Sequence, residues 1–156
     1  HLYADGEGQR MSTFTLDLQR FAEKAGKKAD DLVGQVVADV VARVDMRSPV
    51  GNPALWKHKP PAGYVGGRFR ANWDLTIGAP SNVVTERIDP SGAATVTGNL
   101  AVIPEHAAGN VYYLTNNVPY SVRIEDGWST QAPSGVVGLT AIEWQSIVDK
   151  SAKGMK

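Results

Sequence analysis

The chain contains no cysteine among its 156 residues. Disulfide bonds, thiolate nucleophiles and cysteine-based zinc or iron–sulfur sites are therefore excluded. An excess of charge of one sign is also lacking, because 16 Lys and Arg balance 16 Asp and Glu. A protein drawn to nucleic acid or to a membrane surface by its overall charge would show such an excess. Any electrostatic function must therefore be local.

Long hydrophobic runs are missing as well. The most apolar stretch, residues 32–44, is interrupted by Asp39 and Arg43 and is far shorter than the roughly 20 residues that span a bilayer. We therefore expect no transmembrane segment and no membrane partner. Residues 1–10 lack the apolar run of a secretory signal. Because Met11 could open a coding sequence, they are interpreted as a tag or upstream extension, expected to be disordered, and residues 11–156 as one domain.

Apolar residues recur at steps of three and four over residues 16–44, which is the period of an amphipathic helix. The spacing predicts a long N-terminal helix with Thr15 as its N-cap and Pro49 beyond its end. It is either continuous or divided near Gly26, since a glycine costs about 1 kcal/mol in a helix interior. The valine-rich second half carries the stronger pattern.

Residues 69–77 alternate between apolar and polar without exception, which predicts a strand buried on one face. This alternation places Trp73 in the core and Arg70 on the outer face. Two further strands are predicted at residues 83–88, where the pattern is weaker, and at residues 111–115, which are rich in Val and Tyr.

The remaining segments complete an α+β pattern. Residues 93–103 suit either a strand or a short helix, and residues 127–135 read as a loop. Thr140 and Glu143 have the spacing of a capping box, which predicts a short C-terminal helix. We therefore predict a long N-terminal helix and a short C-terminal helix packed on a small, mainly antiparallel sheet, with a long extended loop.

That loop is residues 47–70, which contain four prolines and four glycines and have no regular period. Five cations and no acid give it a local charge of +5, and two aromatic residues lie between them: Arg47, Lys57, Lys59, Arg68, Arg70, Trp56 and Tyr64. Three interpretations stay open: a solvated loop, contact with an acidic protein neighbour, and nucleic-acid binding by stacking and charge.

Catalytic patterns are sparse. His58 and His106 have no acid or histidine at metal-ligand spacing beside them. Glu105, Glu125 and Asp126 could in principle form an acid/base pair, but nothing in the sequence sets their separation. A small hydrolase that uses Glu105, Glu125 or His58 therefore has minimal support. We predict no catalytic residue, no metal and no cofactor.

Two segments are similar to one known family. SPVGNP at residues 48–53 and GYVGGRFRANW at residues 63–73 resemble the "SPV…TGRLR.NW" segment of phage neck and tail-completion proteins of long-tailed bacteriophages. YYLTNNVPY at residues 112–120 and IEDGWSTQAPSGVV at residues 124–137 resemble the "NN.PYA..LE.G.S.QAP.GMV" signature of that family. Val136 stands where that signature usually has Met.

The resemblance implies a structural virion protein without a catalytic site, which forms a ring at the head–tail joint or at the head-proximal end of the tail. Such a ring, with six-fold symmetry favoured, would join head and tail and let DNA pass. Its partners would be further copies of itself, the head connector and the tail tube or terminator proteins, with possible non-specific DNA in the lumen. It would lie in the virion neck or tail, and in the host cytoplasm during assembly. The alternatives are a tail terminator, a minor tail protein or, more remotely, a nucleic-acid-binding module that uses residues 47–70.

Exposed aromatic side chains on long Pro- and Gly-rich loops are most easily explained by burial against another subunit. On this basis we predict a subunit interface made of residues in and beside the two loops: Trp56, Lys57, Tyr64, Arg68, Arg70, Tyr120, Glu125, Trp128 and Gln131. For Trp128, packing back onto its own sheet stays an open alternative.

Overall fold

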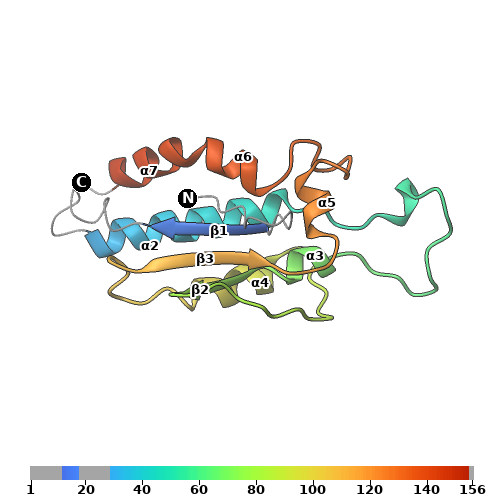
Figure 1. The fold of residues 1–156 in the computed structure, drawn as a ribbon, viewed down its shortest axis with the longest axis horizontal. Helices are drawn as coiled ribbons and strands as arrows, with labels where there is room; N and C mark the ends of the chain where they lie inside the picture. Colours follow the sequence, from blue (N-terminus) through green and yellow to red (C-terminus); the bar gives the residue numbers. More distant parts are fainter. Residues whose placement is uncertain (1–11, 18–28, 155–156) are drawn as a thin grey trace.

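The computed structural model describes residues 12–17, as backbone, and residues 29–154. The elements follow in the order β1 (Ser12–Asp17), α2 (Ala29–Arg47), η2 (Pro53–Leu55), α3 (Arg68–Ala71), β2 (Asp74–Ile77), α4 (Ala93–Leu100), β3 (Val111–Asn116), α5 (Ser121–Glu125), α6 (Val137–Ile142) and α7 (Trp144–Lys153) (Figure 1). The fold class is α+β, as predicted. The expected extension at residues 1–10 lies outside the described residues.

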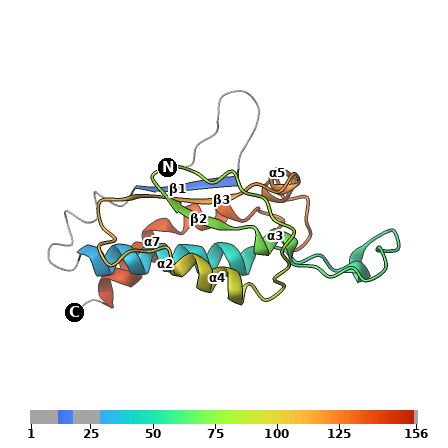
Figure 2. The ribbon, with the colours of Figure 1, turned by 90° about the horizontal axis from the view of Figure 1, so that it is seen from below.

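The sheet has three antiparallel strands in the order β1-β3-β2. β3 is central: its residue Asn116 pairs with Ser12 of β1, and its residue Thr115 pairs with Asp74 of β2. Figure 2 shows α2, α4 and α7 together on one side of this sheet. The core therefore lies between the sheet and the helical layer.

Helix α2 supplies one wall of the core through its valines. They recur at steps of three and four and are almost fully buried: Val33, Val36, Val37, Val40, Val41 and Val44. The sheet contributes Leu75, Tyr112 and Leu114, which are equally buried. Register explains the match, because Leu75 lies opposite Leu114 and both therefore share one face of the sheet.

The prediction of a helix over residues 16–48 is confirmed in its valine-rich half and wrong at its start. Thr15 and Leu16 belong to strand β1, where the alternation Ser-Thr-Phe-Thr-Leu-Asp satisfies a period of two. The predicted break near Gly26 lies outside the described residues. Ser48 and Pro49 follow the last helical residue, as the proline signal indicated.

The strand predicted over residues 69–77 is wrong in its first half. Only Asp74–Ile77 is strand, and Arg68–Ala71 forms the single helical turn α3. Gly67, with φ 114°, turns the chain into α3. The alternation of apolar and polar residues gave a wrong strand here because this segment is buried on several sides rather than on one. Asn72, which the alternation places on the outer face, is as buried as Phe69.

Of the predictions for the later segments, some are confirmed and others are wrong. Residues 93–103, open between strand and helix, contain helix α4, and the strand predicted at residues 111–115 is confirmed as β3. Residues 83–88 form no strand with any described residue. The capping box is also wrong: α6 begins at Val137, so Thr140 lies inside it and donates a hydrogen bond to the Val136 carbonyl oxygen (3.0 Å).

A substitution of Trp73 tests whether this residue belongs to the core. Its side chain is 2% exposed, its Nε1 donates to Ser48 Oγ (2.7 Å), and its ring meets Phe69 edge-on at 5.6 Å. Trp73→Ala should lower the free energy of unfolding by about 3–5 kcal/mol, measured by denaturant titration with circular dichroism. Trp128→Ala is the matched control, because Trp128 is 76% exposed and its loss should change stability by about 0.5 kcal/mol or less. Equal effects of the two substitutions would contradict the assignment.

Candidate functional site

Residues 49–67, hereafter the arm, leave the body after α2 and return to it before α3. Figures 1 and 2 both show the arm reaching beyond the helices and strands at the α5 end of the molecule. The outer part of the arm, hereafter the arm tip, carries the exposed side chains of Leu55 and Trp56. The Trp56 ring lies 4.7 Å from the ring of Tyr64, which is also exposed and whose hydroxyl packs against Gly51 at the arm root. The tip is therefore an apolar cluster without a partner surface in the described part of the chain.

The root of the arm is closely packed. Gly66 and Gly51 bring the two limbs of the arm together, and a Cβ at Gly66 would collide with the Gly51 carbonyl oxygen. Gly67 packs in the same way against the backbone of Asp89 and Pro90. Close approach of backbone to backbone thus explains the glycines that precede α3.

Gln131 ties the arm to the loop of residues 127–135. The Val50 N–H donates to Gln131 Oε1 (3.1 Å), and Gln131 Nε2 donates to the Val50 carbonyl oxygen (2.8 Å). The side-chain amide therefore pairs with one residue of the arm as a neighbouring strand would. This contact sets the direction in which the arm leaves the body.

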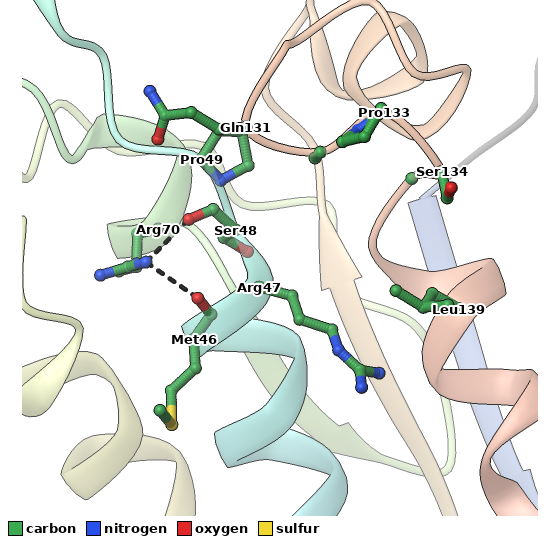
Figure 3. A pocket seen from close by; sticks show the side chains of 11 residues that line it. Met46, Arg47, Ser48, Pro49, Arg70, Gln131, Pro133, Ser134 and Leu139 are labelled. Atoms are coloured by element: carbon green, nitrogen blue, oxygen red, sulfur yellow. Dashed lines mark hydrogen bonds between the residues drawn. The ribbon is translucent and has the colours of Figure 1, made fainter.

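Arg70 binds backbone groups on both sides of the arm root. Its guanidinium donates to the carbonyl oxygens of Met46 (3.1 Å), Ser48 (2.8 Å) and Pro90 (2.7 Å), the first two of which are drawn in Figure 3. Its side chain is only 16% exposed, so the prediction that Arg70 occupies an outer face is wrong. The α3 turn directs it toward the end of α2, where terminal carbonyl groups lack helical partners.

Asp45 lies under Arg70 and is the site residue that sequence reasoning missed. Its side chain is 2% exposed, with Oδ1 3.7 Å from Arg70 Nε and no hydrogen bond to another described residue. Gly92 packs directly against it, since a Cβ there would collide with Oδ1. Burial raises the pKa of Asp45 to about 7, Arg70 lowers it and Asp89 adds a smaller upward effect. The sequence does indicate that Asp45 is buried, because Asp45 follows Val37 and Val41 at steps of four on the same helix face.

Other cations of residues 47–70 are also engaged within the chain. Arg47 pairs with Glu143 and donates to Thr140 Oγ1 (3.0 Å), and Arg68 pairs with Glu86 (2.7 Å). Three of the five cations, Arg47, Arg68 and Arg70, therefore have partners within the chain. Lys57 and Lys59, at the arm tip, are exposed and have no ion pair among the described residues.

Glu125 and Tyr120, predicted at an interface, have roles inside the subunit. The Glu125 carboxylate accepts the backbone N–H groups of Val136 (3.0 Å), Val137 (2.9 Å) and Gly138 (2.7 Å) at the start of α6. This satisfies donors that a helix N-terminus otherwise leaves unpaired. Tyr120 is half-buried against Phe69, and burial raises the pKa of its hydroxyl.

Trp128 lies on the surface beside α5. Its ring is 76% exposed, and the Arg123 guanidinium carbon lies 5.4 Å from the ring centroid, within the range of a cation–π contact. The alternative in which Trp128 packs onto its own sheet does not hold. Its assignment to a subunit interface stays a prediction.

A cleft of about 260 Å³ opens at the arm root. Met46, Pro49, Pro133 and Leu139 form its apolar lining, with Arg70 and Gln131 beside them (Figure 3). Both arginines at the cleft, Arg47 and Arg70, already bind groups of their own chain. Neither arginine is therefore free to bind an anion in the cleft.

The candidate acid/base residues meet other partners. Glu125 binds the start of α6, as described above. His106 Nδ1 lies 3.3 Å from Asp30 Oδ2 on the surface, and His58 is exposed on the arm. Among the described residues no group of three His, Asp or Glu side chains could hold a metal ion. Within the same part of the chain, no helix is both long and apolar enough to cross a bilayer.

Comparison with protein-family models, curated proteins and solved structures finds no match to this chain.

The buried Asp45 predicts an unusual pH dependence. Because its folded-state pKa is about 7 and that of an unfolded Asp is about 4, the folded state retains a proton that the unfolded state releases. The free energy of unfolding should therefore fall as the pH rises from about 5 to about 8. Asp30, Asp89 and Glu143 have lowered pKa values, so their contributions are lost only under more acidic conditions. Denaturant titrations at pH 5, 6, 7 and 8 measure the slope.

Two variants separate the causes. Asp45→Asn should flatten this pH dependence, whereas Arg70→Ala should lower stability by about 3 kcal/mol at pH 8, because it leaves a buried carboxylate unpaired. The loss caused by Arg70→Ala should be smaller in the Asp45→Asn background. Identical pH profiles of the wild type and Asp45→Asn would show that Asp45 does not titrate as described.

Proposed function

We propose that the protein is a non-enzymatic subunit of a ring in the virion of a long-tailed phage, at the head–tail joint or at the head-proximal end of the tail. The observation that carries the proposal is the arm, which is held firmly at its root and bears an exposed apolar tip. In this proposal the tip is buried against an adjacent copy of the same protein.

A contiguous apolar surface on an otherwise compact protein commonly marks a protein–protein interaction site. Ordering a flexible loop on binding costs free energy, and an arm already oriented by Gln131, Arg70 and the glycine contacts avoids part of that cost. When the arm of each copy reaches the next copy, the contact is heterologous, and such contacts generate rings if the rotation closes.

The resemblance to phage neck and tail-completion proteins supports the same proposal. Its two segments, residues 48–73 and 112–137, contain both limbs of the arm, the α3 turn and the loop of residues 127–135. Three residues of those segments, Arg70, Glu125 and Gln131, make the contacts that hold the arm and the loop in place. The similarity therefore coincides with the part of the molecule that orients the arm.

Within this proposal the partners are further copies of the chain, the head connector and the tail tube or terminator proteins, and the protein passes through the host cytoplasm during assembly. Six-fold symmetry is the favoured arrangement, and a tail terminator or a minor tail protein is the alternative role. Contact with DNA in the lumen would be non-specific and weak. With two free lysines at the tip, the slope of log affinity against log salt from this segment would be no steeper than about −2.

The direct experiment measures the mass of the purified assembly by light scattering and images it by negative-stain electron microscopy. A closed ring, in solution or in the phage particle, is the expected result. A subunit that stays monomeric both in solution and in particles would exclude the proposal.

Trp56→Ala tests whether the arm tip makes the contact. Trp56 is 42% exposed in the subunit, so the substitution should leave thermal unfolding nearly unchanged. Self-association should weaken about tenfold or more, because truncation of a buried aromatic anchor typically has an effect of this size. Ile142→Ala is the matched control, since Ile142 is a large exposed residue on α6. If both variants associate like the wild type, the arm tip is not the contact.

A further inference from the structure

Residues 83–88, hereafter the edge segment, have a strand-like sequence and lie in a stretch without helix or strand, with no strand partner among the described residues. They lie in the stretch that runs back along residues 67–72. The Asp89 N–H donates to the Gly67 carbonyl oxygen (3.2 Å), Arg87 Nη2 to the Ala71 carbonyl oxygen (2.8 Å) and the Thr85 N–H to Asn72 Oδ1 (2.7 Å). One side of the edge segment is thus fastened to the body.

Hydrogen bonding alternates along the edge segment. The Val83 and Thr85 carbonyl oxygens accept from Asn117 and Asn72 of the body, and the Arg87 N–H donates to Thr85 Oγ1 within the segment itself. The backbone groups of the residues between them, Val84, Glu86 and Ile88, make no hydrogen bond with another described residue.

This alternation is the pattern of an edge strand. In a strand, the backbone groups of every second residue point to the same side, at intervals of about 7 Å. An exposed row of this kind is a template for pairing with another extended chain. The three residues of this row, Val84, Glu86 and Ile88, are all exposed.

We infer that the edge segment is a docking site for an extended strand of a second copy of this chain, which adds to it by backbone hydrogen bonds. The row of alternating donors and acceptors matches a polypeptide backbone rather than a helix surface or a phosphate chain. This inference depends on the proposed self-association and gives it a second contact, separate from the arm tip.

The sheet order indicates which part of the second copy fits. β1 lies at the edge of the sheet, on the far side of β3 from β2, and its six residues equal the edge segment in length. Pairing of β1 with the edge segment is heterologous and can repeat around a ring. Pairing of two edge segments centred on Glu86 would place two like charges opposite each other, which is unfavourable, and would stop at a dimer.

Amide hydrogen exchange tests the pairing residue by residue. In dilute, dissociated protein the amides of Val84, Glu86 and Ile88 should exchange fast, whereas the amide of Thr85 is already hydrogen-bonded. In the assembled protein those three amides, together with about half of the β1 amides, should slow at least tenfold. Fast exchange of Val84, Glu86 and Ile88 in the assembly would overturn the inference. Slowing only when another virion protein is added would overturn the second copy as the occupant.

A pair of substitutions at one position separates backbone from side chain. Val84→Pro removes an N–H that has no partner among the described residues, so the subunit should fold normally but associate at least tenfold more weakly. Val84→Ala keeps the N–H and should associate like the wild type. Normal association of Val84→Pro would overturn the edge contact and leave the proposed ring standing. A wild type that is monomeric in solution and in particles would overturn both.

Discussion

One guanidinium group connects the parts of this structure on which the candidate site depends. Arg70 binds carbonyl oxygens at the end of α2, at Ser48 directly before the arm and in the turn before α4, and it lies over the buried Asp45. These groups come from residues 45–48 and from residue 90, so a single side chain joins segments more than 40 positions apart. Removing it leaves terminal carbonyls and a carboxylate in a site with little access to water.

The arm root and the arm tip have different roles, because Arg70 fixes the root to the body and leaves the tip exposed. Stability comes from the valine face of α2, Trp73 and the inner face of the sheet, none of which includes the arm tip. The tip can therefore change its surroundings on association without a loss of subunit core. Because its root is fixed, the arm holds the tip in one direction. Association through the tip therefore loses less conformational entropy than association through a flexible loop would.

The sequence predicted best where burial is one-sided over several turns or residues. The valine half of α2 and the strand β3 have one face in the core, so their periodicity was correct. α3 is one turn long and enclosed on several sides, so no period could distinguish it from a strand. Among the site residues, the arm aromatics were found from composition. The Arg70–Asp45 pair was not, because it joins positions 25 apart that only the tertiary fold brings together.

The two proposed contacts use different chemistry, and this difference bears on the choice between protein and nucleic-acid partners. The arm tip would bury apolar side chains, and the edge segment would pair neutral backbone groups. Neither contact involves release of counterions, so association through them should depend little on salt, whereas binding to phosphates weakens steeply as salt rises. The ion pairs of Arg47, Arg68 and Arg70 act in the same direction, because they withdraw three cations from the surface of the arm and its root. In the proposed ring, such subunits would be held together without an arm that binds DNA strongly, which is what the proposed passage of DNA through the joint requires.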